Sequence, residues 1–475
     1  MSTNKQLYKG LFWSAIDKFS IAGIQMVLEI LMARILIPQD YGLMGMLLVV
    51  MSFTKIFIDC GLGNALIFKK NRTDTDFATA FYASAILGVI LYLILLISAP
   101  YVSAFYNHDI TFYVRVMGVV IIFNSISAIY KARLTISMDF RSQAKFSIIA
   151  VVASGLLGLG LAYLGYGIWA LIIQNLTFAF FNLLFMSINL KWIPKYRFSK
   201  QSFFELYNYS SKLLYAAILN TIYINFNSVI LGKFYSVKSL GYYTKSYQFT
   251  IFPISMLTDV VQRVFFPYLT NFQENKSLLF QHNNYYNKLI LVILLPIFTL
   301  VILFSESLIG LILSEQWLGM VEPFNILLTA MLFYPLIVMN MNIFQVIGKT
   351  SKFLFVEILT KITGIIILFF CYKHGLIGLC IGLLIQFMIQ YIITSFFVSR
   401  VLKSNFFKSF EVFIYIAYAI LIYLAVNYIL KSDLFGVFFI KVITAVVFVI
   451  MLYFLLYFAL YKNEISKLYE KIVKN

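Results

Sequence analysis

Long apolar segments, separated by short polar connections, make up almost the whole chain, and they restrict its possible folds more than any other feature. Most are close to or longer than the roughly 20 residues that an α-helix needs to cross a hydrocarbon core of about 30 Å. Because 62% of the 475 residues are hydrophobic and only 12% are charged, a soluble domain could not cover so much apolar surface. The sequence therefore predicts an all-α integral membrane protein with about 14 transmembrane helices. The expected spans are 11–36, 41–66, 77–99, 110–130, 146–164, 167–188, 210–232, 241–266, 288–305, 324–346, 353–373, 376–398, 409–430 and 437–460.

The basic residues lie in the short connections and predict an orientation. A formal net charge of +18 is compatible with a nucleic-acid partner, but the Lys and Arg residues do not form one patch. They gather on one side of the predicted membrane, at 69–72 after the second span, at 131–145 after the fourth and at 191–200 after the sixth. Because positively charged loops of membrane proteins are retained in the cytoplasm, we expect a multi-pass protein of the cytoplasmic membrane with both termini in the cytoplasm. Nucleic acid is not an expected partner.

A short pattern occurs twice in the chain. Arg34 precedes Gly42 by eight positions where the first span gives way to the second, and Lys233 precedes Gly241 in the same way between the seventh and eighth spans. The two glycines are 199 positions apart, which places spans 1–6 over spans 7–12. Copies separated by six spans share one orientation, so an axis along the membrane normal would relate them. The predicted domains are a six-helix lobe at 1–200, a second at 201–402, and two additional helices with a cytoplasmic tail at 403–475.

The sequence lacks the motifs of common catalytic sites. It contains no His-Glu-x-x-His zinc motif, no glycine-rich phosphate loop ending in Lys and Ser or Thr, and no Gly-x-Ser-x-Gly. Its three histidines, His108, His282 and His374, are far apart in sequence, and its three cysteines have no metal-ligand spacing. We therefore predict no catalytic residues, no metal and no cofactor, and a protein that is not an enzyme.

Polar residues inside the predicted spans are the remaining functional signal, because a charge at such depths costs at least a few kcal/mol unless it faces water or a partner. In the first span Lys18, Gln25 and Glu29 lie on one narrow helix face, and in the eighth span Lys245 and Gln248 share another. These stripes predict a polar cavity. Its candidate residues are Lys18, Gln25, Glu29, Arg115, Asn220, Tyr223, Asn227, Lys245 and Gln248.

A second group of intramembrane charges has two interpretations. Lys55 with Asp59, and Glu357 with Lys361, are spaced by four residues on one helix, so each pair can neutralise itself and hold helices in register. The same charges could instead couple transport to an ion, and the sequence leaves both interpretations open. The group comprises Asp17, Lys55, Asp59, Asp259, Glu357 and Lys361.

Three stretches near the start of the chain resemble a known family. They are Leu11–Lys18, Met32–Gly42 with its Ala-Arg-x-Leu-x-Pro-x-Asp-Tyr-Gly pattern, and Phe57–Ala65. They are similar to bacterial O-antigen and exopolysaccharide flippases of the multidrug/oligosaccharidyl-lipid/polysaccharide exporter superfamily. The resemblance is strongest over the first 70 residues and elsewhere rests on the number and layout of the spans. It implies a V-shaped pair of lobes around a cavity that opens alternately to each side of the membrane.

The cargo implied by this resemblance is an undecaprenyl-diphosphate-linked oligosaccharide in the bacterial cytoplasmic membrane. Lys18, Arg115 and Lys245 would then meet the diphosphate, and Asn, Gln and Tyr side chains would bind sugar hydroxyls. Expected partners are this substrate, membrane lipids and other polysaccharide-assembly membrane proteins. Two alternatives stay open. A drug or cation antiporter of the same superfamily would depend on an acid such as Asp17 or Glu29, and an integral membrane polymerase or transferase is disfavoured by the short outer connections.

Overall fold

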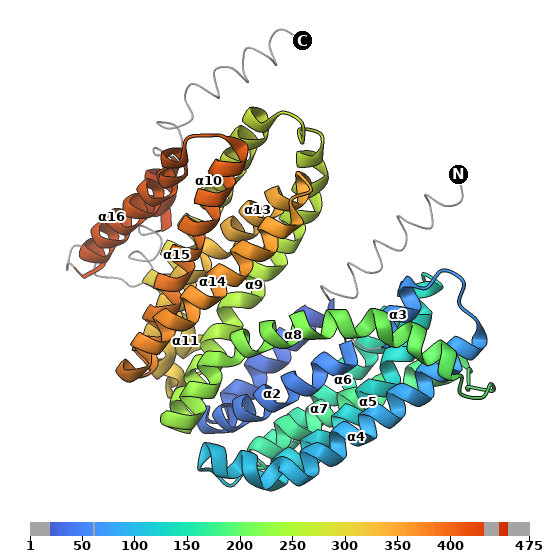
Figure 1. Cartoon of the computed structure of the whole chain (residues 1–475). Coiled ribbons are helices and arrows are strands. Elements are labelled where there is room, and N and C mark those ends of the chain that lie inside the picture. The colour runs from blue at the N-terminus through green and yellow to red at the C-terminus, as the bar shows by residue number, and fades with distance from the viewer. Residues whose placement is uncertain (1–19, 60–61, 432–445, 455–475) are drawn as a thin grey trace. The chain divides into compact units, whose positions relative to one another are not determined.

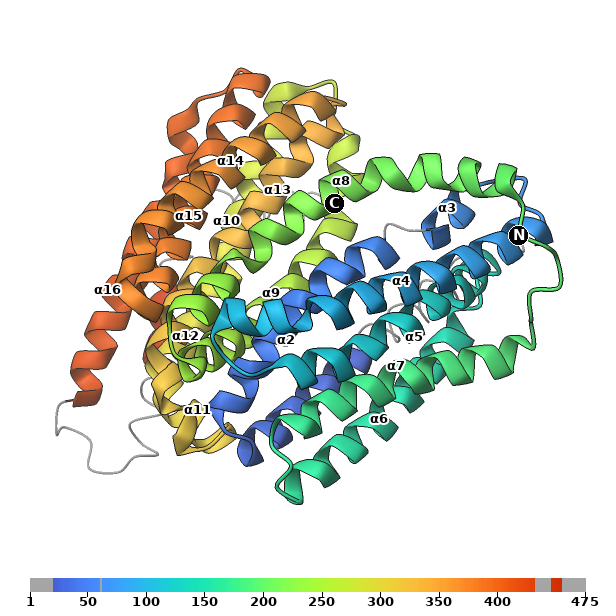
Figure 2. The ribbon, with the colours of Figure 1, turned by 60° about the horizontal axis from the view of Figure 1, so that its bottom comes forward.

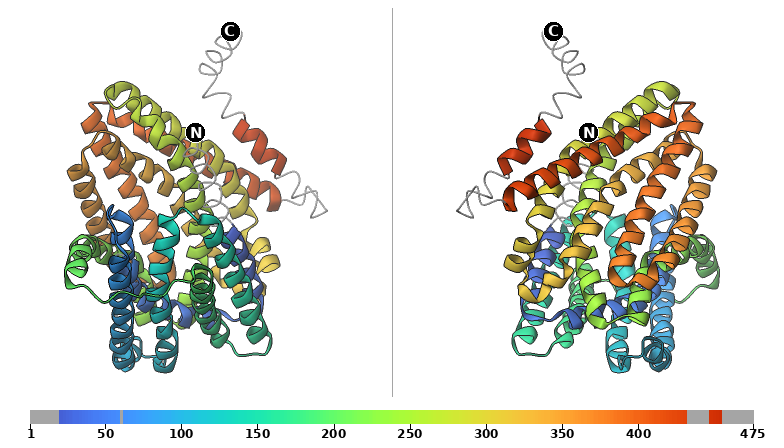
Figure 3. Two further views of the ribbon diagram at one scale, coloured as in Figure 1. Left: turned by 90° about the vertical axis from the view of Figure 1, so that its right-hand side faces the viewer. Right: turned by 90° about the vertical axis from the view of Figure 1, so that its left-hand side faces the viewer.

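The structure is a computed structural model, and it describes residues 20–59, 62–431 and 446–454. Within these ranges the chain forms helices and no strands (Figure 1, Figure 3). Ten helical segments of the described chain are long and apolar enough to cross a membrane. The all-α, membrane-type fold is thus confirmed, whereas the count of about 14 spans stays a prediction. Asp17 and Lys18 lie outside the described residues, as does the side chain of Asp59.

The first of two compact units, unit 1, comprises the described residues up to Thr244 together with Ile312–Trp317. In unit 1, α5 packs against α4 and α7, and α7 packs against α6 (Figure 2). The long helix α8 lies against α2, α3 and α4. After a helix at 20–35, the elements are α2 (Pro38–Asp59), α3 (Leu62–Phe68), α4 (Asp74–Tyr106), α5 (Thr111–Ile136), α6 (Phe140–Tyr163), α7 (Ile168–Leu190), α8 (Lys200–Phe234) and the start of α9 (Val237–Thr270).

Unit 2 comprises Lys245–Leu311 and the described residues from Leu318 onward. Its apolar core lies between α9, α10, α13 and α16, around buried side chains such as Leu291, Leu336 and Tyr415. After α9, the elements are α10 (Lys276–Leu303), α11 (Ser305–Ile312), the 3-10 helix η1 (Glu315–Met320), α12 (Val321–Met331), α13 (Phe333–Val346), α14 (Thr350–Cys371), η2 (Tyr372–His374), α15 (Gly375–Leu402), η3 (Phe406–Phe410) and α16 (Glu411–Lys431). The predicted domain boundaries near residues 200 and 402 stay a prediction.

A buried amide network joins three helices of unit 2. The Oδ1 atom of Asn340 on α13 accepts hydrogen bonds from Asn283 at 3.0 Å and Asn287 at 3.4 Å, both on α10. Its Nδ2 donates to Ser395 Oγ at 2.9 Å and Thr394 Oγ1 at 3.3 Å, both on α15. All five side chains are nearly or fully buried. Because hydrocarbon offers few alternative partners, these bonds help to hold α13 against α10 and α15.

The repeated glycine pattern forms a helix crossing inside unit 1, which we call the glycine crossing (Gly42 on α2 and Gly241 on α9). A Cβ atom at Gly42 would collide with the carbonyl oxygen of Val237, and one at Gly241 with that of Pro38. Val237 and Pro38 are themselves 199 positions apart, so each copy of the pattern makes the same contact with the other. Glycine, which has no Cβ, is the residue that lets two backbones approach this closely. The repeat noticed in the sequence therefore has a physical reason.

The basic residues of the pattern also make equivalent contacts. Arg34 Nε donates to the carbonyl oxygen of Ile312 at 2.8 Å, and Lys233 Nζ donates to that of Phe105. Ile312 ends α11, and Phe105 lies in the last turn of α4. Since the C-terminal end of a helix carries partial negative charge, each cation stabilises the end of a neighbouring helix.

The segment Ile312–Trp317 belongs to unit 1, although the chain before and after it belongs to unit 2. Trp317 is fully buried; its Nε1 donates to the carbonyl oxygen of Ala33 at 2.7 Å, and its ring meets that of Tyr41 edge-on, with 5.4 Å between centroids. Gln316 donates to the carbonyl oxygens of Ala33 and Leu36 at 3.2 and 3.1 Å. These bonds satisfy carbonyl groups at the end of the helix at 20–35, which have no partner within their own helix.

Candidate functional site

Unit 1 contains a cavity of about 670 Å³, which we call the unit 1 cavity. It is bordered by the helix at 20–35 and by α2, α3, α5, α6 and α7. Its volume lies in the range of roughly 300–1,000 Å³ that is typical of ligand pockets. The polar lining residues are Lys55, Asn64, Asn124, Ser127, Lys131, Thr135, Gln143, Ser147 and Asn182.

Helix α5 supplies four of these polar residues through its periodicity. Asn124, Ser127, Lys131 and Thr135 are spaced at i, i+3, i+7 and i+11, which places them on one helix face. Ser127 and Thr135 donate their hydroxyl protons to backbone carbonyls one turn earlier in α5, at 2.7 and 2.9 Å. Asn124 and Lys131 are therefore the principal donors that α5 offers to a ligand.

Two cations give the unit 1 cavity its electrostatic character. Lys55 on α2 and Lys131 on α5 both line it, and its described lining residues include no carboxylate. Both lysines belong to candidate membrane spans, and a cation at the centre of a span costs about 2.5–3.5 kcal/mol on insertion scales unless it reaches water or a partner. Like charges in a low-dielectric cleft concentrate the opposite charge. The unit 1 cavity is thus suited to an anionic ligand such as a phosphate ester.

Amide groups add neutral hydrogen-bonding capacity to this cavity. Gln143 on α6 is 8% exposed, and its Oε1 has no hydrogen-bond partner within the part of the chain that the structure describes. A buried acceptor left unsatisfied costs about 1–3 kcal/mol. A ligand hydroxyl or amide that donates to Gln143 would remove this cost, so the cavity can bind a polar group next to an anionic one.

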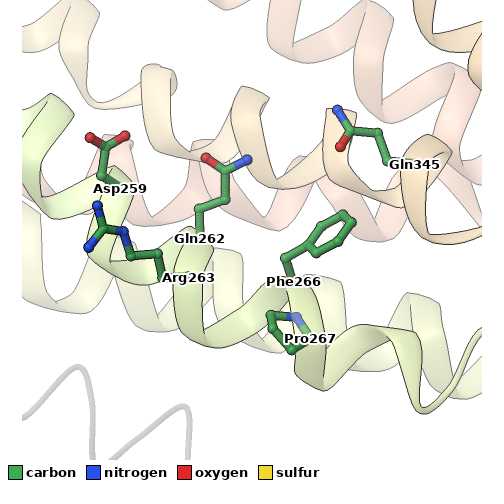
Figure 4. A pocket seen from close by; sticks show the side chains of 6 residues that line it. All are labelled: Asp259, Gln262, Arg263, Phe266, Pro267 and Gln345. Atoms are coloured by element: carbon green, nitrogen blue, oxygen red, sulfur yellow. The ribbon is translucent and has the colours of Figure 1, made fainter. Parts of the chain in front are cut away.

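Unit 2 has a second pocket of about 440 Å³, which we call the unit 2 pocket. It is lined by Asp259, Gln262, Arg263, Phe266 and Pro267 of α9 and by Gln345 of α13 (Figure 4). Figure 4 shows Gln262, Phe266 and Gln345 pointing into the same space between the two helices. Gln262 Nε2 donates to Asn342 Oδ1 on α13 at 3.0 Å, which fixes the position of this amide.

Those residues singled out for a cavity by the sequence that the structure describes are not among the residues that line these two pockets. Asn227 is buried on α8 and donates to the hydroxyl of Tyr243 at 3.2 Å. Lys245 is fully buried, 3.4 Å from Oε1 of Gln248 and 5.7 Å from the ring centre of Phe249. The substrate-binding role stays a prediction for all of them. The described candidates outside the two linings are Gln25, Glu29, Arg115, Asn220, Tyr223, Asn227, Lys245 and Gln248.

The charged residues that the sequence assigns to ion coupling or to structural pairs lie partly in the two pockets and partly on a helix surface. Lys55 lines the unit 1 cavity and Asp259 lines the unit 2 pocket. Glu357 and Lys361 form the expected ion pair on α14, with 2.8 Å between Oε1 and Nζ. Both side chains of this pair are partly exposed. Its contact is confirmed, and its role in ion coupling stays a prediction.

Sequence reasoning missed Lys131, Asn124, Gln143 and Asn182. The apolar run ends at Tyr130 and therefore predicts that Lys131 lies in a connection, but α5 continues to Ile136. The signal that could have found this site is the polar stripe along α5, whose spacing continues across the predicted end of the span. Hydrophobicity alone ended the helix too early.

An ion cluster joins the connection after α3 to the starts of α4 and α8. Lys69 Nζ lies 2.9 Å from Asp76 Oδ1 and 2.8 Å from Glu205 Oε2. Asp76 also accepts from Ser202 on α8 and forms a capping box with Thr73 at the start of α4. Burial alone would lower the pKa of Lys69, but its hydrogen bonds to Glu205 and Asp76 raise it, and the bond from Lys69 lowers the pKa of Glu205. The cluster thus fixes the start of α8 within unit 1.

Solved structures with a similar fold are membrane transporters. The structure described as lipid II flippase MurJ, inward closed conformation, has a TM-score of 0.75 at 15% identity, covering 95% of this chain and 99% of MurJ. An inward-facing multidrug resistance MATE family transporter of the MOP superfamily has a TM-score of 0.62 at 17% identity, covering 82% of this chain and 98% of that one. At these identities the likeness establishes the fold.

Sequence comparison identifies the family. The chain is 24% identical over 333 residues to the teichuronic acid biosynthesis protein TuaB of Bacillus subtilis (strain 168), covering 69% of this chain and 68% of TuaB. Residues 31–322, more than half of the chain, match the profile of the family described as "Polysaccharide biosynthesis protein". This agrees with the resemblance found in the first 70 residues. The chain therefore belongs to the polysaccharide biosynthesis protein family of multi-pass membrane proteins.

Proposed function

We propose that this protein is a flippase that moves an undecaprenyl-diphosphate-linked oligosaccharide across the bacterial cytoplasmic membrane for surface polysaccharide synthesis. Family membership supports the polysaccharide class of the substrate. The likeness to the MurJ and MATE folds supports alternating access as the mechanism. In this proposal both termini face the cytoplasm, in agreement with the loop charges.

The observation that carries the proposal is the cationic lining of the unit 1 cavity inside a membrane-spanning unit. Lys55 and Lys131 bring two ammonium groups to the lining of that cavity. A diphosphate is the part of a lipid-linked sugar that these groups would attract, because lysine binds phosphate as a point charge. Neighbouring amides such as Asn124 and Gln143 would bind polar groups next to the diphosphate.

This assignment adds to the cations first proposed from the sequence. Lys18, Arg115 and Lys245 remain candidates for the diphosphate at other stages of transport. We rank Lys55 and Lys131 above these three residues as candidates for binding the diphosphate, because both line one cavity. A drug or cation antiporter would instead require a carboxylate facing its cargo, and no described lining residue of the unit 1 cavity supplies one.

The test is transport by purified protein in liposomes. Lipid-linked oligosaccharide extracted from the source bacterium is added to the membrane, and its exposure to a membrane-impermeant glycosidase is followed over time. Each charge-assisted contact is worth about 1.5–3 kcal/mol, so Lys55→Ala or Lys131→Ala should lower transport by about 10- to 150-fold. Lys70→Ala, which removes an exposed cation outside the cavity, is the matched control and should transport normally.

Two results would contradict the proposal. If the wild-type liposomes expose no more oligosaccharide than protein-free liposomes, the protein is not a flippase for this substrate. If wild type transports but the double variant Lys55→Ala, Lys131→Ala does so equally fast, the cationic cavity is not the diphosphate site. Membrane abundance and elution profile of each variant show whether it is folded.

A further inference from the structure

The unit 2 pocket has polar lining residues on a helix that is a candidate membrane span. Asp259, Gln262 and Arg263 follow one another along α9, which is itself a candidate membrane span. Charged and amide side chains within a span are expensive unless they face water, a partner or a ligand. Gln262 meets this need through its hydrogen bond of 3.0 Å to Asn342. The exposed side chains of Arg263 and Gln345 can serve a ligand in the pocket.

The lining of the unit 2 pocket differs in kind from that of the unit 1 cavity. The formal charges of its one carboxylate (Asp259) and its one guanidinium (Arg263) cancel, whereas the two lysines give the lining of the unit 1 cavity a positive formal charge. Two carboxamides, Gln262 and Gln345, add both donors and acceptors. A pocket without net charge, rich in donors and acceptors, fits a neutral polyhydroxyl group better than a diphosphate.

The shape of these groups points to a sugar in particular. Carboxylate, carboxamide and guanidinium groups are planar and present two polar atoms side by side, so each can bind two neighbouring hydroxyls at once. Phe266 adds an aromatic ring to the same lining (Figure 4). The face of a sugar ring that carries C–H groups can pack on such a ring, as apolar groups do on aromatic side chains.

The pocket is built on helices that are held in place. Asn342, which receives the hydrogen bond from Gln262, is 2% exposed. Two residues earlier on α13, Asn340 bonds α13 to α10 and α15. Gln345 therefore projects from a helix whose position is fixed by buried polar contacts. Binding groups held on rigid elements lose little freedom when a ligand arrives.

We propose that the unit 2 pocket binds the saccharide part of the transported lipid at one stage of the transport cycle. This inference rests on the proposed function and deepens it. The unit 1 cavity recognises the anionic group that all such lipids share, and the unit 2 pocket recognises the hydroxylated group that distinguishes one lipid from another. Substrate selection is thus expected to follow residues of α9 and α13.

The experiment compares two ligands on the full-length protein in nanodiscs. Undecaprenyl diphosphate carries the anion without a sugar, and the lipid-linked oligosaccharide extracted from the source bacterium carries both. Arg263→Ala with Gln345→Ala should weaken binding of the oligosaccharide lipid at least about tenfold, because one charged and one neutral hydrogen-bonding group are lost. Binding of undecaprenyl diphosphate should stay unchanged, which also shows that the variant is folded. Both side chains are exposed, and Gln262 is retained so that Asn342 keeps its partner.

Matched variants separate this inference from the proposed function. Gln273→Ala removes an exposed amide of unit 2 outside the pocket and should bind both ligands normally. Lys55→Ala with Lys131→Ala should weaken both ligands. Equal binding of the oligosaccharide lipid by wild type and the Arg263→Ala, Gln345→Ala variant overturns the sugar site while leaving the flippase proposal intact. If that variant binds both ligands more weakly than wild type to the same extent, the sugar site is also overturned. A wild-type protein that binds neither lipid overturns both proposals.

Discussion

Replacing Gly42 by alanine should destabilise unit 1, although alanine is ordinarily the better helix former. The added Cβ would overlap with the carbonyl group of Val237, and a backbone atom cannot rotate away as a side chain can. Overpacking a tightly packed site costs about 1–3 kcal/mol and occasionally more, and a clash with backbone belongs at the upper end. Replacing glycine by alanine inside a helix favours folding by up to about 1 kcal/mol. The net loss in free energy of unfolding is therefore about 2 kcal/mol or more.

Gly160→Ala is the matched control for this substitution. Gly160 lies in α6, and a Cβ built there meets no heavy atom within 4 Å, so only the gain in helix propensity remains. Thermal unfolding of the full-length protein in detergent measures both variants. One kcal/mol corresponds to roughly 2–4 °C for a unit of about 150–250 residues. Gly42→Ala should melt about 4–8 °C or more below wild type, and Gly160→Ala at or above it.

The partner glycine gives a second, sharper test. Gly241→Ala should cost about as much as Gly42→Ala, since its Cβ would meet the carbonyl group of Pro38. The double variant should cost clearly less than the sum, because separating α2 from α9 once relieves both clashes. The close backbone approach would be refuted if Gly42→Ala melted at the same temperature as Gly160→Ala or at a higher one. It would also be refuted if the losses in stability of the two single variants added up to that of the double variant.

Two further changes test other parts of the fold. Because the pKa of Glu205 is lowered by Lys69, the ion pair stabilises the folded chain above the ordinary carboxyl value of 4.5 and is lost as the pH falls through the lowered value. The protection factors of amides at the start of α8, which correct for the intrinsic slowing of exchange in acid, should therefore fall with the pH in the wild type, and Glu205→Gln should show the lower protection already at neutral pH. Asn340→Ala removes four hydrogen bonds between helices, each worth on average about 0.6 kcal/mol in a membrane protein. Its free energy of unfolding should fall by about 2 kcal/mol, while Asn271→Ala, at an exposed position, should melt like wild type.

The sequence predicts a helix well where the length of an apolar run alone determines the helix. The span expected at 167–188 matches α7, which runs from Ile168 to Leu190. The span expected at 77–99 is the apolar middle of α4, which begins at Asp74 through a capping box and ends at Tyr106. Polar end residues extend a helix without adding hydrophobicity, so hydropathy places the middle of a helix better than its ends.

The candidate site was harder to predict because it depends on which helix faces meet. Gln25 and Glu29 share a face of the first helix, but periodicity does not say which neighbour that face contacts. The unit 1 cavity combines Lys55 of α2 with Lys131 of α5, and 76 positions of sequence separate them. Packing between helices, which no single-helix pattern contains, decides that they line one space. The glycine crossing was the exception, because glycines repeated at a fixed offset are visible in the sequence itself.

The placement of Ile312–Trp317 has a consequence for how the chain is assembled in the cell. Ala33 and Leu36 leave the ribosome long before Gln316 and Trp317, the residues that later satisfy their carbonyl groups. During synthesis these carbonyl groups therefore bond to water or lipid headgroups until nearly 300 further residues have been inserted. A fragment that stops at Thr244 would lack the indole that packs on Tyr41. Separately expressed halves cut at that point are thus expected to reach a native unit 1 only when the second half is supplied.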